Sequence, residues 1–408
     1  MHKKLIMRAK RLAKRGLVLF GKVKHSVLDG FLNKNIGVFE MDGKHVFCGY
    51  YDLDPLKGDL LLVHVVDVNS EVGNSPADLG VFNIVNGKYE NFSSTMAWCW
   101  QQGSRLRWSN REENEVYFND YDEGGYCCKM FNIEKRRVIK KWDVPLYDIS
   151  TDEKTGISVD FERLQKLRPG YGYNNERNFK IIEKAPKDDG LVLVDLETNE
   201  RKLLISLRDL AIQGGDNEFI YNHYINHVSF SPDSRQVMFF HIWDERHSSF
   251  DWKTNLCIYD LRKKNCKVIE VMAVVSHYAW VNNNEIIITC YTEIGPEEYR
   301  LYDIKGGTYR LLKNKRLNSD GHPTMCGPMR FFSDTYPDRL SYQRLFWFDM
   351  ETNESKEVKK FYADDKMTGE KRCDLHPKYN NSGVIFVDST FRKGKRSVAM
   401  IRVKGKEK

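Results

Sequence analysis

The sequence lacks any hydrophobic run long enough to cross a membrane, since no stretch of its 408 residues approaches the ~18–20 apolar residues that a spanning helix needs. It also lacks a CxxC pair, and its nine cysteines are an odd number that includes the adjacent Cys127 and Cys128. These features disfavour a structural zinc site and a disulfide framework. We interpret the cysteines as reduced, mostly buried thiols of a cytoplasmic protein.

Acidic residues are absent from the first 28 positions, which contain nine Lys or Arg. Subtracting these nine from the net charge of +7 leaves −2, so the rest of the chain has no basic excess of the kind that binds nucleic acid. Apolar residues recur at helical spacing from Leu5 to Val27. We expect residues 1–36 to form a basic amphipathic helix that lies peripherally on the anionic inner membrane. A helix packed against the side of the protein and a solvated tail are the alternatives.

One module repeats along the remainder of the chain: an apolar strand that ends in Asn or Asp, a polar turn, and another strand. The copies end at Asn83, Asn132, Asp195, Asp260, Asp303 and Asp349, and a degenerate seventh copy ends at Arg402. Their spacings of 43 to 65 residues suit four-stranded propeller blades. We therefore predict an all-β protein, with residues 37–408 forming a seven-bladed β-propeller.

A histidine recurs at one position of four consecutive predicted blades, three residues before an apolar or aromatic residue. These histidines are His227, His277, His322 and His376, while Arg105 and Tyr50 occupy the same position in earlier blades. Equivalent positions on innermost strands form a ring at one mouth of the central channel, and the returning strands should bring His64 and His241 to that mouth. A single histidine there is most often structural, but the convergence of several favours a functional site. Neutral imidazole binds Mn, Fe, Ni or Zn and also serves as a general base.

A long insertion in the third predicted blade, residues 161–190, should emerge on the same face. It contains Arg168, Tyr171 and Tyr173, which offer a cation for a carboxylate or phosphate and aromatic faces for a sugar ring. The alternative is an ordinary surface loop. Together with Arg105 and His64, these three residues are the candidate substrate-binding side chains.

Several short segments in residues 200–400 resemble the oligogalacturonate lyase family and its wider group of WD40-like and TolB-like propellers. They are NHVSFSPD at 226–233, SHYAW at 276–280, DGHP at 320–323, DTYPD at 334–338 and DLHP at 374–377. The chain also resembles propeller proteins of bacterial surface-polysaccharide gene clusters. It has no clear match to the glutamine-containing part of the lyase metal site.

The resemblance implies a divalent metal, typically manganese, held by His277, His322 and His376. It implies His241 as the catalytic base with His227 beside it, and Arg105 or Arg168 as the clamp for a uronate carboxylate. The expected reaction is β-elimination on a uronic-acid-containing saccharide, in which loss of the C5 proton expels the C4 oxygen. The alternative is a non-catalytic glycan-binding or scaffolding propeller, or a glycosyl-transfer component, in capsule or lipopolysaccharide assembly at the inner membrane. A protein-interaction hub fits the polar channel mouth less well.

Overall fold

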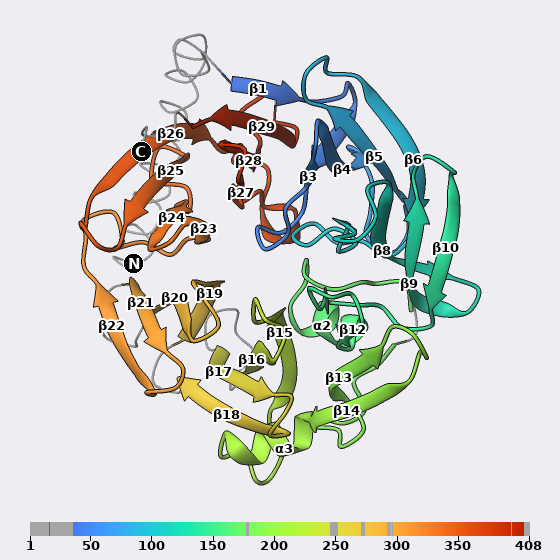
Figure 1. Ribbon diagram of the computed structural model, residues 1–408, viewed down its shortest axis with the longest axis vertical. Coiled ribbons are helices and arrows are strands. Elements are labelled where there is room, and N and C mark those ends of the chain that lie inside the picture. The colour runs from blue at the N-terminus through green and yellow to red at the C-terminus, as the bar shows by residue number, and fades with distance from the viewer. Residues whose placement is uncertain are drawn as a thin grey trace, which may run out of the picture.

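The computed structural model describes residues 16, 36–176, 179–244, 252–270, 274–291, 295, 297–392 and 394–403. Its strands form seven sheets arranged around a central channel (Figure 1), which confirms the predicted all-β, seven-bladed propeller. The predicted basic helix lies outside these residues apart from Gly16 and Ile36. Within the described part of the chain, no helix combines the length and apolar character needed to cross a bilayer.

The seven blades follow the chain, and each pairs its strands antiparallel from the channel outward. Blade one contains β2 (Lys44–Phe47), β4 (Leu60–Asp67), β5 (Ala77–Asn83) and β6 (Tyr89–Thr95), with the short β3 (Leu56–Lys57) added to β4. Blade two contains β7 (Arg107–Trp108), β8 (Glu115–Asp122), β9 (Gly125–Asn132) and β10 (Arg137–Trp142). Blade three contains β11 (Asp148–Ile149), β12 (Thr155–Ser158), β13 (Gly190–Asp195) and β14 (Arg201–Ser206). Blade four contains β15 (Asn222–Phe230), β16 (Gln236–Asp244), β17 (Trp252–Asp260) and β18 (Asn265–Glu270).

Blade five contains β19 (Val274–Trp280), β20 (Glu285–Tyr291), β21 (Glu297–Asp303) and β22 (Thr308–Leu312). Blade six contains β23 (Thr324–Gly327), β24 (Arg330–Ser333), β25 (Tyr342–Asp349) and β26 (Ser355–Tyr362). Blade seven contains β27 (Lys378–Asn380), β28 (Val384–Ser389) and β29 (Ser397–Arg402), and its outer strand is β1 (Ile36–Phe39) from the other end of the chain. This β1–β29 pairing closes the ring.

The repeated Asn or Asp has a local structural cause. At the end of β17, the side chain of Asp260 accepts hydrogen bonds from the backbone N–H groups of Arg262 and Lys263. The corresponding residues at the ends of β5, β13, β21 and β25 make the same pair of bonds, and the one at the end of β9 makes one. Such side-chain bonds stabilise the turn between the two outer strands of a blade, so the motif marks each outer hairpin.

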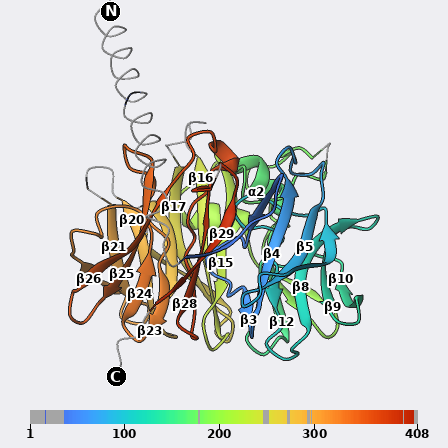
Figure 2. The same ribbon diagram turned by 90° about the horizontal axis from the view of Figure 1, so that it is seen from above.

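The insertion after β12 begins with the short helix α2 (Phe161–Leu167), whose first turn is capped by the Asp160 side chain. Its loop folds back on the helix, because Tyr173 stacks on Phe161 with ring centroids 4.5 Å apart. Figure 2 shows α2 at one end of the channel and β3 and β23 at the other. We call these ends the upper and lower mouths.

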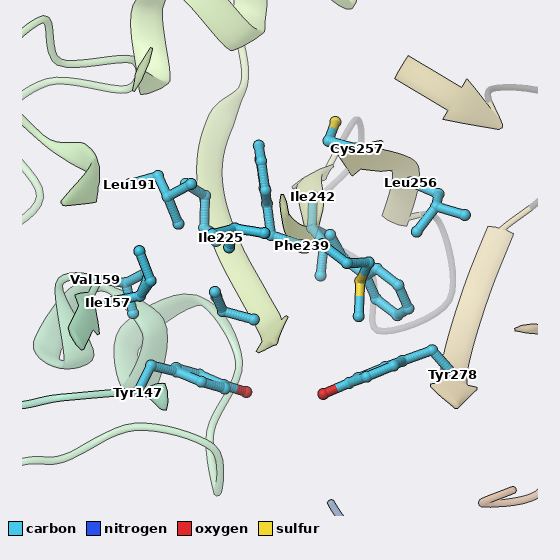
Figure 3. Packing of buried hydrophobic residues seen from close by; sticks show 14 of the residues in the cluster. Tyr147, Ile157, Val159, Leu191, Ile225, Phe239, Ile242, Leu256, Cys257 and Tyr278 are labelled. Carbon is cyan, nitrogen blue, oxygen red and sulfur yellow. The ribbon is translucent and has the colours of Figure 1, made fainter. Parts of the chain in front are cut away.

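Two further short helices lie outside the sheets: α3 (Leu207–Gln213) and the 3₁₀ helix η1 (Gly369–Lys371). The largest apolar cluster comes mainly from blades three, four and five, and Figure 3 shows two of its members, Tyr147 and Tyr278, with their hydroxyl ends directed toward one another.

Candidate functional site

Four histidines from consecutive blades meet in the channel, and we call them the histidine cluster. His227 and His277 lie in β15 and β19, while His322 and His376 come just before β23 and β27. Ring centroids are 5.9 Å apart for His227 and His277, 3.9 Å for His277 and His322, and 4.5 Å for His322 and His376. Each side chain is buried.

The backbone at these positions departs from regular strand geometry. His227 and His376 have φ values of +53° and +43°, in the left-handed region that non-glycine residues rarely adopt. The pairing register also shifts next to His227 in β15 and His277 in β19. Strained backbone of this kind is concentrated at functional sites, where surrounding structure holds it in place.

Carboxylates fix the orientation of two of the rings. Asp320 bonds to Nδ1 of His277 at 3.0 Å, and Asp334 bonds to Nδ1 of His322 at 2.8 Å. Asp334 also accepts the backbone N–H groups of His322 and His376. A carboxylate on Nδ1 selects the tautomer in which Nε2 keeps its lone pair, which is the arrangement found around histidine ligands of metals.

Three residues of the cluster region could hold a metal ion. Donor atoms of His322, Asp374 and His376 all lie within 4.8 Å of one another, and all three residues are buried. The Nε2 atoms of His322 and His376 have no hydrogen-bond partner in the structure, although buried polar atoms are normally paired. Two imidazole nitrogens and a carboxylate oxygen suit a divalent transition metal such as manganese, iron or zinc. His322 and His376 are two of the three predicted ligands, and Asp374 stands in this group instead of the predicted His277. The donor types still fit the divalent metal that the sequence resemblance implies.

Burial and neighbouring charges shift the pKa values of the four histidines in different directions. Burial lowers the pKa of His277, and the nearby His322 adds to this effect. Burial also lowers the pKa of His227 and His376 well below the ordinary value. For His322, burial opposes protonation, but the carboxylate of Asp334 and more distant aspartates outweigh it and raise the pKa. Three of the four rings are therefore held neutral.

A single arginine stands beside the cluster without a carboxylate partner. Arg168, at the end of α2, places its guanidinium over the rings of Trp252 and Tyr171, at 4.9 and 5.7 Å from their centroids. No ion pair to Arg168 occurs within the described ranges. Tyr171 in turn packs edge-on against His227 at 5.7 Å. A half-buried guanidinium fixed by stacking is ready to bind an anion.

The structure does not bring the remaining predicted residues into this cluster. Arg105 is occupied by a two-point ion pair with Asp52, at 3.1 and 2.8 Å. His64 stacks on Phe47 and bonds to Ser104, between blades one and two. Tyr173 is fully buried within the insertion, where it stacks on Phe161.

His241, the predicted base, belongs to a different buried group. Its Nε2 lies 2.8 Å from Nδ1 of His223, whose Nε2 pairs with Asp216 at 3.0 Å. Both imidazoles stack near Trp243, and Gly214 at the end of α3 lies against His241. His241 is fully buried there, apart from the four channel histidines.

Sequence reasoning missed several residues that complete the site. Tyr50 and Tyr51 sit in the middle of it: Tyr50 stacks on His227 at 5.3 Å, and Tyr51 packs against His322 at 5.2 Å. Arg372 links the insertion to the cluster, since it bonds to both Tyr171 and Asp374. The sequence already places Tyr50 at the repeat position of blade one, although it was not among the candidate site residues.

The fold and site define a class: a closed seven-bladed propeller whose channel is lined by histidines and carboxylates. No family model matches the chain. No curated protein matches it either. Among solved structures, the fold is that of the oligogalacturonate lyases. One such lyase in complex with manganese matches with a TM-score of 0.66 and 14% identity, over 91% of this chain and 93% of that one. The oligogalacturonate lyase from Vibrio parahaemolyticus matches with a TM-score of 0.64 and 11% identity, over 91% and 94%.

A further match is the β-propeller domain of the Trilobed protease from Pyrococcus furiosus, with a TM-score of 0.51 and 10% identity over 90% of this chain and 97% of that one. That domain has an open velcro topology, whereas β1 closes the ring here. At these identities the comparisons establish the propeller fold.

Proposed function

We propose that the protein is a metal-dependent lyase that cleaves a uronic-acid-containing oligosaccharide by β-elimination. The observation that carries this proposal is the donor set of His322, Asp374 and His376, with two buried Nε2 atoms that have no partner. Its position in the channel of a lyase-like propeller supports the same reaction class.

His322, Asp374 and His376 would hold the divalent cation, and the manganese bound to the similar lyase makes manganese the first candidate. A cation bound there supplies Lewis acidity that withdraws charge from a uronate carboxylate and so acidifies the C5 proton. Asp334 contributes by fixing the His322 ring and the backbone of His376.

We assign the uptake of the C5 proton to His277, because its ring lies 3.9 Å from that of His322 but outside the group of metal-donor residues. Its Nδ1 is committed to Asp320, so the proton stays on Nδ1 and the lone pair on Nε2. Its lowered pKa keeps the ring neutral and able to accept a proton at neutral pH. His277 replaces His241 in this role, because His241 is enclosed with His223 and Asp216.

Arg168 would bind the carboxylate of the incoming saccharide. Its guanidinium is held between aromatic rings, has no acidic partner among the described residues, and lies close enough to depress the pKa of His227. Tyr171 is itself buried and supports the guanidinium from one side. This arrangement favours an acidic sugar over a neutral one.

The test is elemental analysis of protein purified without added metal or a metal-binding tag, alongside a His322→Ala, His376→Ala double variant. We expect near-stoichiometric divalent metal in the wild type and its loss from the double variant. The buried-histidine control His45→Gln should retain the metal, since His45 bonds to the backbone of Arg396 outside the cluster.

Metal-loaded protein is then incubated with uronic oligosaccharides and followed by the ultraviolet absorbance of the unsaturated product. His277→Ala should abolish turnover while leaving the metal in place. Absence of metal from the wild type would overturn the metallolyase proposal. Metal and saccharide binding without turnover would instead support the non-catalytic glycan-binding alternative.

A further inference from the structure

A second cavity opens at the lower mouth, on the opposite side of the histidine cluster from α2. Its volume is about 270 Å³, and its walls come from the loop before β3 and from β15, β19, β23 and β27. Tyr51 joins the two regions: its ring contacts His322 at 5.2 Å, and it also lines the lower cavity. The cavity therefore lies directly beneath the cluster but outside the candidate metal centre.

The walls of this lower cavity are rich in aromatic rings. Tyr51, Tyr278, Trp280 and Tyr379 line it, and they arrive from three separate segments of the chain. The hydroxyl of Tyr51 donates to the backbone oxygen of Tyr278 at 2.8 Å and accepts from its N–H, so both residues are fixed in place. A rigid wall of electron-rich rings suits a cation or a sugar-like face.

The charges around the lower cavity select between these ligands. Asp52 is neutralised by Arg105, and the buried Lys378 is paired with Asp388 and with the backbone oxygen of His376. The remaining charged residue of the wall is Asp54, which is exposed. Its two carboxylate oxygens accept only neutral N–H groups, from Leu56 and Asn380, and it forms no ion pair within the described ranges.

One hydrogen-bond donor in the wall also lacks a partner. The indole Nε1 of Trp280 is buried and bonds to nothing in the structure. A buried N–H without an acceptor costs free energy, and a ligand hydroxyl would supply the missing acceptor once the indole turns its covered N–H toward the cavity. The lower cavity thus combines an unneutralised carboxylate, aromatic faces and a donor for an oxygen atom.

We propose that the lower cavity binds a small organic ammonium ion that also carries a hydroxyl group. The ammonium group lies against the aromatic rings near Asp54, and the hydroxyl accepts from Trp280. A choline-type headgroup and an amino sugar share this chemistry. The cavity therefore prefers the opposite charge from the Arg168 side of the channel, and its ligand is separate from the acidic saccharide proposed above.

The experiment titrates choline and glucosamine into the full-length protein, with 3,3-dimethylbutan-1-ol and glucose as their uncharged counterparts. Binding is measured by calorimetry and by the indole N–H resonance of Trp280, which a Trp280→Phe variant assigns. We expect one of the two cations to bind at least ~10-fold more tightly than its uncharged counterpart and to shift that resonance. Which cation binds distinguishes the headgroup from the amino sugar.

Asp54→Asn should weaken cation binding ~10-fold, because it removes the charge but keeps an acceptor for the Leu56 N–H. The matched control Asp59→Asn alters an exposed carboxylate in the turn between β3 and β4, outside the cavity wall, and should change nothing. Thermal unfolding of both variants checks that they fold. The proposal is overturned by equal binding of charged and uncharged ligands, by an unaltered Asp54→Asn variant, or by no cation binding at about 10 mM, where a millimolar site is filled. None of these outcomes depends on lyase activity.

Discussion

The carboxylate of Asp334 sets the chemical state of the candidate metal centre, and the conservative change Asp334→Asn tests this directly. Asp334 receives Nδ1–H of His322 at 2.8 Å, the backbone N–H of His322 at 2.8 Å and that of His376 at 3.2 Å. Asparagine has nearly the same shape but only one acceptor oxygen. The NH₂ group of asparagine takes the place of one carboxylate oxygen, so at least one of the three donors faces another donor instead of an acceptor.

Two costs follow from that mismatch. If the amide nitrogen faces His322, the ring changes tautomer, so that Nε2 carries the proton and loses the lone pair a metal needs. Loss of such an orienting partner typically lowers metal affinity by about 10–100-fold. In either orientation one buried donor loses its acceptor, which should reduce the free energy of unfolding by about 1–3 kcal/mol.

Metal affinity is measured by competition with a chromophoric chelator, and stability by denaturant unfolding of the chelator-treated protein. Asp303→Asn is the control, since Asp303 caps an exposed hairpin turn and touches no histidine. It should leave metal affinity unchanged. Wild-type metal affinity together with wild-type stability in Asp334→Asn would refute the reasoning, because in either orientation of the amide at least one of the three donors loses its acceptor.

Three further predictions concern the framework of the propeller. Burial lowers the pKa of His64 to about 4, below its unfolded value of about 6.5, so its stabilising contribution is complete above pH 6.5 and is lost as the pH falls toward 4. Between pH 7.5 and pH 5, the free energy of unfolding should therefore fall by about 2 kcal/mol more in the wild type than in His64→Gln. An equal fall in the two proteins would contradict this. Gly103→Ala places a Cβ 2.3 Å from Cε1 of His64 at a φ of +60°; it should destabilise the protein by about 2 kcal/mol more than Gly87→Ala, which has a similar φ and open space around it. Phe39→Ala removes a buried ring that packs on Phe82 from the ring-closing strand, and calorimetric unfolding should show a loss of about 3–5 kcal/mol; a loss below ~1 kcal/mol would mean that β1 contributes little to closure.

Local chemistry made most of the fold predictable. Asn83 and the equivalent residues in five other blades cap their hairpin turns through their own side chains, so the pattern is readable in one sequence. The seventh copy is degenerate for a physical reason. Its outer partner β1 comes from the other end of the chain, so no hairpin turn joins β29 to its outer strand. The pairing of Ile36 with Ile401 joins residues from opposite ends of the chain, and no local pattern reveals such a contact.

The repeat also brought four histidines to one point in the channel, but it misplaced two others. His64 and His241 were expected at the same mouth because their strands return toward it. Their side chains contact Ser104 and His223 rather than the histidine cluster. Side chains of a strand alternate between its two faces, so reaching the right end of a blade does not determine which face a residue occupies.

The aspartates illustrate the same limit more sharply, because Asp320 and Asp374 each precede a histidine by two residues and look equivalent in the sequence. Asp320 orients His277 of the preceding blade through Nδ1. Asp374 instead bonds to Arg372 and turns a carboxylate oxygen toward the donor atoms of His322 and His376. An identical spacing thus produces one orienting carboxylate and one candidate metal ligand. Part of the difference is local, because Arg372 lies two residues before Asp374 and bonds to it, whereas Asn318 stands at the corresponding position before Asp320. The rest depends on the assembled ring, in which the preceding blade places His277 beside Asp320 and His322 beside Asp374.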